Sequence, residues 1–298
     1  MLRDAFAPAK VNLTLAVRRR RSDGYHDLES LVVFARTGDD LSFAPGGTDF
    51  ALIVKGPAAA AAGPDADNLV LKAAHLLAHR VPDLPRGLFT LTKRLPVAAG
   101  LGGGSSDAAA ALRLLAEAGR LSLDDPRVME AARLTGSDVP VCLDPRTRMM
   151  RGTGADLGQA IDLPSLPALM INPRVAVPTP DVFRKLALEP GRECPADPAA
   201  RLERHALESS SLARRRADLV TLLVGTRNDL EPPAIALAPV IGEALGLLRQ
   251  APGCRLARMS GSGATVFGLF DTCRASAAAA QQIRAVHPDW WIKSTMLG

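Results

Sequence analysis

The sequence predicts an α+β fold of two domains, at residues 1–163 and 164–298. In the first part, short segments with the two-residue alternation of strands are interspersed with longer segments of helical periodicity. In the second part, the predicted order of strand, helices, strand, strand, helix, strand is that of a ferredoxin-like domain. A stretch rich in proline and serine at residues 163–167 separates the two. A chain of 298 residues is long enough for both domains to have a hydrophobic core.

Composition and charge exclude several classes of protein. With 47% hydrophobic and 22% charged residues, the chain is neither disordered nor fibrous. It has no run of about 18 apolar residues and no apolar signal segment near its start, so we expect a cytoplasmic protein without a membrane partner. Its 4 cysteines lack the spacing of metal ligands or of a disulfide framework. The net charge of +5 favours anionic partners.

The first predicted elements are two strands joined as a hairpin. Apolar residues alternate along residues 11–17, so Lys10 and Asn12 project side by side from the opposite face. A polar turn at residues 18–24 precedes the second strand, at residues 28–34.

The remaining elements follow from periodicity and from helix caps. Further strands are predicted at residues 41–43, 50–54, 87–93, 168–172, 255–259, 264–270 and 291–297. Helices are predicted from Asn68, at 108–118, 125–134, from residue 179, and at 207–224, 239–249 and 274–286.

The segment around which the chain is organised is residues 95–107, where a predicted strand leads through four glycines into an alanine-rich helix. Ser105 or Ser106 is predicted to cap that helix, and Asp107 to lie in its first turn. Glycines that lead into a helix N-terminus form an anion site, most often for phosphate. An exposed turn, the structural alternative, would not need four glycines. The segment has neither a Walker A lysine nor a complete G-x-G-x-x-G pattern.

A second cap signal, at residues 136–140, places Asp138 at a helix start. Taken alone, an aspartate at that position is usually structural, and Lys10 alone is an ordinary surface cation. Together with a phosphate loop they supply what phosphoryl transfer needs. The carboxylate can orient an acceptor hydroxyl and take its proton, and the lysine can stabilise developing negative charge.

Residues 96–109 resemble the nucleotide loop of the GHMP kinases, the family of galactokinase, homoserine kinase and mevalonate kinase. The resemblance implies a ribosomal-protein-S5-like N-terminal domain, a ferredoxin-like C-terminal domain and an active site in the cleft between them. It also implies ATP as the phosphate donor, with Mg²⁺ bridging its phosphates and no dedicated protein ligand identified for the ion. The residues implied to bind the nucleotide are Asn68, Pro96, Gly100, Leu101, Gly102, Gly103, Gly104, Ser105 and Ser106.

Four further motifs, at residues 8–15, 23–28, 136–140 and 260–265, resemble one branch of this family. In that branch the alcohol is a methylerythritol that carries a cytidine diphosphate group, and its 2-hydroxyl is phosphorylated for isoprenoid synthesis by the non-mevalonate route. The resemblance implies Lys10 and Asp138 as the catalytic pair and cytosine held by aromatic rings and a histidine. The residues implied to bind this substrate are Asn12, Tyr25, His26, Asp138, Phe183, Gly261, Ser262 and Gly263.

Three points stay open at this stage. Phe183 could be a core residue instead of stacking on the base. Ala155 stands where the family has a glutamate, which leaves the role of residues 151–157 undefined. The substrate could be another alcohol, such as homoserine or mevalonate, although Tyr25 and His26 argue against this.

A different class of function is a basic nucleic-acid-binding module. The two arginine runs, at residues 18–21 and 214–216, have no interleaved aromatic residues, so we expect no nucleic-acid partner. We expect a monomer or a weak homodimer that acts on a small molecule.

Overall fold

The computed structural model describes residues 2–63, 67–195, 198–199 and 216–298. Contacts divide the chain into two compact units, in each of which separate segments come together. Unit 1 consists of Met1–Lys10, Gly38–Val97 and Gly102–Pro145. Unit 2 consists of Val11–Thr37, Ala98–Leu101 and Arg146–Gly298. The predicted domain boundary at residue 163 divides the chain into two consecutive parts and not into these units. That boundary stays a prediction.

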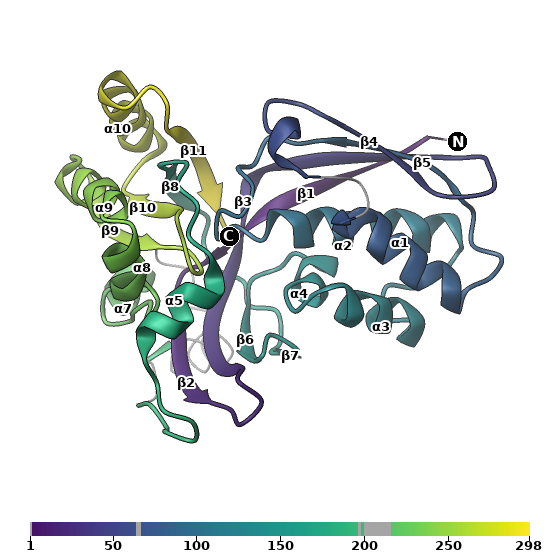
Figure 1. The fold of residues 1–298 in the computed structure, drawn as a ribbon. Helices are drawn as coiled ribbons and strands as arrows, with labels where there is room; N and C mark the ends of the chain where they lie inside the picture. Colours follow the sequence, from purple (N-terminus) through teal and green to yellow (C-terminus); the bar gives the residue numbers. More distant parts are fainter. Residues whose placement is uncertain (1, 64–66, 196–197, 200–215) are drawn as a thin grey trace. The chain divides into compact units, whose positions relative to one another are not determined.

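Unit 1 is a helical layer against a small sheet (Figure 1). Strand β4 (Ala51–Lys55) pairs in parallel with β5 (Gly87–Thr92), which pairs antiparallel with the end of β3 (His26–Pro45). Strand β1 (Arg3–Asn12) also pairs with β3. Four helices pack against one another: α1 (Leu69–Arg80), α2 (Gly103–Ala118), α3 (Pro126–Thr135) and α4 (Val139–Leu143). The unit also contains a short 3₁₀ helix, η1 (Ala59–Ala61).

Two features of the sequence fix the core of unit 1. The rings of Phe43 and Phe89 pack with their centroids 4.7 Å apart, and both side chains are fully buried. Along α2, Ala108, Ala109, Ala110 and Ala111 are buried, so neighbouring elements approach this helix closely. Small side chains therefore stand where neighbouring elements enclose α2. The close packing restrains this helix, including its N-terminal turn.

Unit 2 contains the predicted ferredoxin-like arrangement. Its antiparallel sheet has the order β3, β11 (Trp291–Leu297), β8 (Leu166–Asn172), β10 (Val266–Phe270) and β9 (Cys254–Met259). Helices α9 (Val240–Gln250) and α10 (Cys273–Val286) pack on this sheet. The order of the last four strands, with the first and third strands in the middle, is that of the ferredoxin-like fold, which confirms the prediction.

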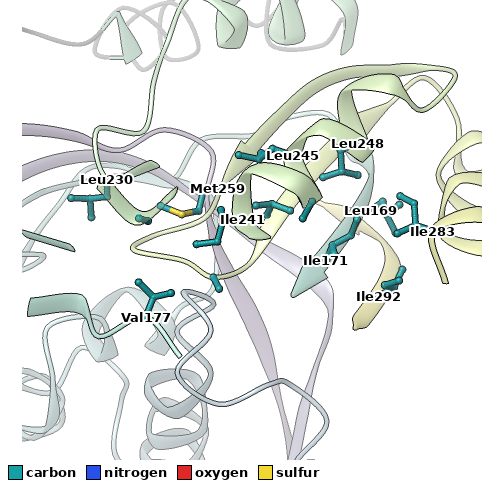
Figure 2. Packing of buried hydrophobic residues seen from close by; sticks show 14 of the residues in the cluster. Leu169, Ile171, Val177, Leu230, Ile241, Leu245, Leu248, Met259, Ile283 and Ile292 are labelled. Carbon is teal, nitrogen blue, oxygen red and sulfur yellow. The ribbon is translucent and has the colours of Figure 1, made fainter. Parts of the chain in front are cut away.

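The core of unit 2 lies between these helices and the sheet. Figure 2 shows Leu169 and Ile171 of β8 packed with Leu245 and Leu248 of α9 and Ile283 of α10. The unit is completed by β2 (Ala16–Arg20), β6 (Arg148–Gly152), β7 (Asp156–Leu157), α5 (Thr179–Leu186), α7 (Arg216–Val224) and α8 (Glu231–Leu237). No helix in the described part of the chain is both long and apolar enough to cross a bilayer.

The structure corrects the predicted strands near the N-terminus. The strand expected at residues 11–17 is interrupted between β1 and β2, because the N–H of Leu15 donates to the carbonyl of Arg227 and leaves the β3 ladder. The strands expected at 28–34 and 41–43 are one strand, β3. Gly38 lets β3 continue past the backbone of Ala7. A Cβ at position 38 would lie only 2.2 Å from the carbonyl oxygen of Ala7. The predicted hairpin is confirmed by the pairing of β2 with β3, with Gly24 at φ +87° in its turn.

Two predicted helical segments need comment. Helix α8 is absent from the sequence prediction, and its two adjacent prolines lie in the first helical turn, where proline is tolerated. Of the helix expected at 207–224, residues 207–215 lie outside the described residues, as do Arg214 and Arg215 of the second arginine run. The remainder forms α7.

Candidate active site

In unit 1 the structure brings Lys10 and Asp138 together. Lys10 lies on β1 with a side chain only 5% exposed, and its Nζ donates to Oδ2 of Asp138 at 2.7 Å. Asp138 immediately precedes α4 but makes no side-chain cap to that helix. Its carboxylate is 29% exposed, so the ion pair has one buried and one accessible partner. The arrangement leaves carboxylate surface open to a ligand.

The structure corrects the predicted start of the helix after the glycines. Helix α2 begins at Gly103, and its N-cap is Gly102 in the left-handed region at φ +59°. Ser105 and Ser106 are therefore inside the first turn, and the carbonyl of Gly102 accepts from the N–H of Ser106 at 2.8 Å. The N–H groups that precede this bond have no partner within a helix, so they can bind an anion.

Lys10 packs against this helix start. A Cβ at Gly102 would lie 3.1 Å from Cβ and 3.2 Å from Cε of Lys10. A side chain at position 102 would therefore crowd the lysine as well as strain the backbone. The ion pair and the anion-binding turn form one compact group within unit 1.

Ser106 is structural, whereas Ser105 is accessible. The hydroxyl of Ser106 is buried, donates to the carbonyl of Pro8 at 2.7 Å and lies 3.4 Å from Sγ of Cys142. The side chain of Ser105 is half-buried. Burial raises the pKa of the Cys142 thiol to about 12, so this buried cysteine stays protonated at neutral pH.

Asp107 does not lie in the first turn of the helix, where the sequence predicted it. It is 3% exposed, and its Oδ2 accepts from Nζ of Lys93 at 2.6 Å. Lys93 also donates to Oδ2 of Asp39 at 2.6 Å. The prediction failed because α2 begins several residues earlier than expected, which carries Asp107 out of its first turn and into the core.

The other predicted nucleotide residues of unit 1 lie at its surface. Asn68 caps α1 by accepting from the N–H of Val70 at 3.0 Å, as its position in the sequence predicted. Asn68 and Pro96 are half-buried, Gly103 is half-buried and Gly104 is exposed.

In unit 2, His26 stacks on Phe183. Their ring centroids are 4.6 Å apart and the planes differ by 23°. Burial, together with the nearby charge of Arg20, lowers the pKa of His26 below its usual 6.5, which favours the neutral ring at neutral pH. Its buried Nε2 has no hydrogen-bond partner among the described residues. Tyr25, the next residue along, is 68% exposed.

Phe183 packs in the core, which is one of the two alternatives left by the sequence, and its stacking on the base stays a prediction. One side of the ring stacks on His26, and the side chain also packs against the hydrophobic cluster of unit 2. The ring is therefore held in place by the core.

Asn12 and the turn at residues 260–263 are joined in unit 2. The N–H of Asn12 donates to Oγ of Ser260 at 3.2 Å, and its Nδ2 donates to Oγ of Ser30 at 2.7 Å. The buried Oδ1 of Asn12 has no partner among the described residues. A Cβ at Gly261 would lie 3.5 Å from this oxygen. The turn thus covers an unused acceptor.

Several contacts hold that turn in shape. Nδ2 of Asn228 donates to the carbonyls of Met259 and Gly261 at 2.8 and 2.9 Å. The hydroxyl of Ser260 donates to the carbonyl of Gly100 at 2.9 Å. Gly261 and Gly263 have φ +57° and +89°.

Gly100 and Leu101 belong to unit 2, and a Cβ at Gly100 would lie 2.4 Å from the Ser260 carbonyl oxygen. The hydroxyls of Ser262 and Thr179 are 2.7 Å apart.

Some residues that shape these groups were not found by the sequence analysis. They are Asp39, Lys93, Ser30 and Asn228. The signal that could have indicated Lys93 is its position between an apolar strand and the glycine segment. The departure at Ala155 lies in the loop between β6 and β7, a short hairpin that pairs Met150 with Leu157.

Within the described residues, no three His, Cys, Asp or Glu side chains gather in a way that could hold a metal ion. The first turn of α2 offers N–H donors, which suit phosphate oxygens and not a cation. The anion-binding turn therefore fits the phosphates of a nucleotide and not a cation.

Comparison with known families agrees with this geometry. The family model of the GHMP kinases N terminal domain matches residues 68–144, and that of the GHMP kinases C terminal domain matches residues 206–289. The first match includes α2 and Asp138.

Individual relatives are similar over almost the whole chain. The chain is 58% identical over 295 residues to 4-diphosphocytidyl-2-C-methyl-D-erythritol kinase of Xanthobacter autotrophicus, covering 98% of each. It is 57% identical over 292 residues to the enzyme of the same name from Methylobacterium radiotolerans, covering 98% of this chain and 97% of that protein. A crystal structure of 4-(cytidine 5'-diphospho)-2C-methyl-D-erythritol kinase has a TM-score of 0.77 at 33% identity and covers 99% of both chains. Homoserine kinase from Cytophaga hutchinsonii shares the fold, with a TM-score of 0.72 at 19% identity over 99% of this chain and 95% of that one.

Proposed function

Since the chain belongs to the 4-diphosphocytidyl-2-C-methyl-D-erythritol kinases, phosphotransferases of the GHMP kinase superfamily, we propose that it phosphorylates the 2-hydroxyl of 4-diphosphocytidyl-2-C-methyl-D-erythritol. A GHMP kinase uses ATP, so the products are ADP and the phosphorylated alcohol. The observation that carries this proposal in the structure is the Lys10–Asp138 ion pair packed against the N-terminus of α2.

The two residues of the ion pair can act on the acceptor hydroxyl and on the transferred phosphoryl group. The acceptor hydroxyl oxygen forms a bond to the γ-phosphorus while the bond from that phosphorus to the β,γ-bridging oxygen breaks. Asp138 orients the hydroxyl and receives its proton, and ADP leaves with the electron pair of the broken bond. Lys10 holds Asp138 in place through the ion pair and stabilises charge on the transferred phosphoryl oxygens.

The nucleotide is assigned to unit 1. The phosphates bind the N–H groups of Gly103, Gly104 and Ser105, with Gly102 allowing their close approach. Asn68 and Pro96 are proposed to contact the rest of the nucleotide. Part of the charge of the phosphates would be neutralised by Mg²⁺ when the ion is bound with the nucleotide.

The cytidyl end of the alcohol substrate is assigned to unit 2. Tyr25 presents an exposed ring, and the stacked pair of His26 and Phe183 presents a second aromatic surface. The unpartnered Nε2 of His26 can bond a polar edge of the base. Asn12, with its unpartnered Oδ1, and the turn of Gly261, Ser262 and Gly263 are proposed to bind the remainder of the substrate.

The substrate assignment is tested by measuring ADP release with a panel of alcohols. We expect turnover with 4-diphosphocytidyl-2-C-methyl-D-erythritol and a kcat/KM at least about 10³-fold lower with homoserine, mevalonate or free methylerythritol, because these lack the base and diphosphate that anchor the substrate. Equal turnover of homoserine or mevalonate would make the chain a GHMP kinase of another specificity. Product mass and phosphorus NMR would identify the phosphorylated hydroxyl.

The cytidine assignment is tested by Tyr25→Ala. Stacking of a base on an aromatic side chain contributes about 1–3 kcal/mol, so KM for the cytidyl substrate should rise about 5- to 150-fold while KM for ATP stays constant. Tyr25 is 68% exposed, so the fold should tolerate the change. Phe6→Ala, at another ring that is 44% exposed, is the matched control and should leave both constants unchanged. An unchanged KM for the cytidyl substrate in Tyr25→Ala would refute the assignment.

A further inference from the structure

A buried charge cluster lies at the start of α2 and has no role in the reaction described above. It consists of Asp39, Lys93 and Asp107, whose side chains are 0%, 5% and 4% exposed. Nζ of Lys93 donates to one oxygen of each carboxyl group at 2.6 Å. We refer to these three residues as the Lys93 cluster.

The Lys93 cluster lies directly against the anion-binding turn. A Cβ at Gly103, the first residue of α2, would be 3.2 Å from Nζ of Lys93. Only the absence of a side chain at Gly103 lets the cluster approach the backbone that is proposed to bind phosphate. Asp107 is four residues further along the same helix, so the cluster also anchors the helix behind that turn.

The two carboxyl groups of the cluster are not equivalent. Asp39 accepts from Lys93 and also, through Oδ1, from the N–H groups of Arg94 at 2.5 Å and Leu95 at 2.8 Å. Both carboxyl oxygens of Asp39 therefore have donors. Asp107 accepts from Lys93 alone, and its buried Oδ1 has no partner among the described residues. A proton added to the cluster therefore belongs on Asp107.

The charge of Asp107 is poised to change near neutral pH. Burial raises its pKa to about 7, the ammonium of Lys93 opposes this rise, and the carboxylate of Asp39 adds to it. With both carboxyl groups ionised the cluster carries one net negative charge, and with Asp107 protonated it is neutral. An incoming phosphate chain at the same turn favours the neutral form, because like charges repel strongly in a buried setting.

Several charged side chains on the elements packed against α2 have partners away from Asp107. Lys10 of β1 and Asp138 before α4 bind each other. Lys72 of α1 donates to the Thr135 carbonyl, Arg80 of α1 binds Glu130 of α3, and Arg127 of α3 binds Asp125. On α2 itself, Arg113 donates to the carbonyls of Cys142 and Phe6. Burial makes the largest contribution to the pKa of Asp107, and the charged groups that act on it are Lys93 and Asp39.

We propose that the Lys93 cluster positions the phosphate-binding turn and couples nucleotide binding to protonation, with Asp107 taking up a proton when the phosphate chain binds. The inference rests on the proposed binding of ATP at this turn. Lys93, Asp39 and Asp107 act as positioning residues, since none of them is assigned a contact with the nucleotide.

The direction of the pH dependence follows from this coupling. The complex holds more protons than the free protein, so the affinity for ATP is greatest below neutral pH and falls as pH rises above about 7. If the bound phosphates favour the protonated carboxyl tenfold, Kd is expected to weaken by about sevenfold between pH 6 and pH 8.5. In Asp107→Asn the side chain keeps its shape and its acceptor oxygen but cannot titrate. Its Kd should vary by less than about twofold over this range.

The experiment is titration calorimetry of the full chain with ATP and excess Mg²⁺, without the alcohol substrate. At pH 7.5, buffers of different ionisation enthalpy report the number of protons exchanged. We expect the wild-type protein to take up roughly half a proton per site and Asp107→Asn to take up close to none. Asp125→Asn is the matched control, because Asn caps the start of α3 as well as Asp does, and it should behave as the wild type.

The outcomes separate the inference from the function on which it rests. Uptake in the wild type and in Asp125→Asn, with none in Asp107→Asn, supports the inference. ATP binding without proton uptake in the wild type overturns it, and this result does not depend on how any variant folds. Equal uptake in the wild type and Asp107→Asn also overturns it. Absence of ATP binding by the wild type would instead refute the proposed nucleotide site.

Discussion

Asp138→Asn is expected to lower kcat by a factor of about 10²–10⁴, the range that a positioned general base contributes. The amide can still accept a hydrogen bond from Nζ of Lys10, which is 2.7 Å from the native carboxylate. It cannot take the proton of the acceptor hydroxyl. Because the nucleotide is assigned to the α2 turn, the Kd for ATP should change by less than about threefold. ADP-release kinetics and ATP titration measure the two quantities separately.

The variant should fold normally. Asp138 makes no side-chain cap to α4 and is partly exposed, so thermal unfolding should occur within a few degrees of the wild-type temperature. Asp125→Asn makes the same chemical change at the cap of α3 and should retain full turnover. A kcat within threefold of the wild type in Asp138→Asn would show that another group receives the proton.

Lys10→Met is expected to lower kcat by about 10²–10³, the loss seen when one preorganised electrostatic donor is removed from an active site. Methionine preserves much of the apolar stem that packs against Gly102 but removes the charge. It also leaves the carboxylate of Asp138 without its ion-pair partner. The predicted defect is therefore in kcat, and single-turnover phosphoryl transfer should be slowed by the same factor.

Lys72→Met is the control for this variant. Lys72 is another lysine of unit 1, and its ammonium donates to the carbonyl of Thr135 at 3.0 Å, without any assigned part in the transfer. Its kcat should stay within about twofold of the wild type. If both lysine variants lost activity equally while remaining folded, the effect would reflect the net charge of the unit and not the position of Lys10.

Local signals accounted for most of the helices and for the ferredoxin-like order of strands. Asn68 and Asp125 cap helices where the sequence placed them, since a cap depends on only a few neighbouring residues. The length of β3 could not be predicted in this way. Its polar middle resembles a turn, and it continues as a strand because the backbone of a distant segment approaches Gly38.

The candidate site shows the same division between local and distant information. The glycine segment and the aspartate before α4 are readable from neighbouring residues. The partner of Asp138 is 128 positions away, and it was predicted from family motifs and not from periodicity. The Lys93 cluster escaped prediction because it depends on where α2 begins, and a left-handed Gly102 moved that start by several residues.

The buried Cys142 has a practical consequence for covalent chemistry on this kinase. A neutral, enclosed thiol is a poor nucleophile, so alkylating agents and mild oxidants spare Cys142, whose Sγ lies 3.4 Å from the Ser106 hydroxyl. Cys273, at the start of α10, is exposed and is reached first. A fluorophore or a surface tether would therefore attach through Cys273 while Cys142 stays unmodified.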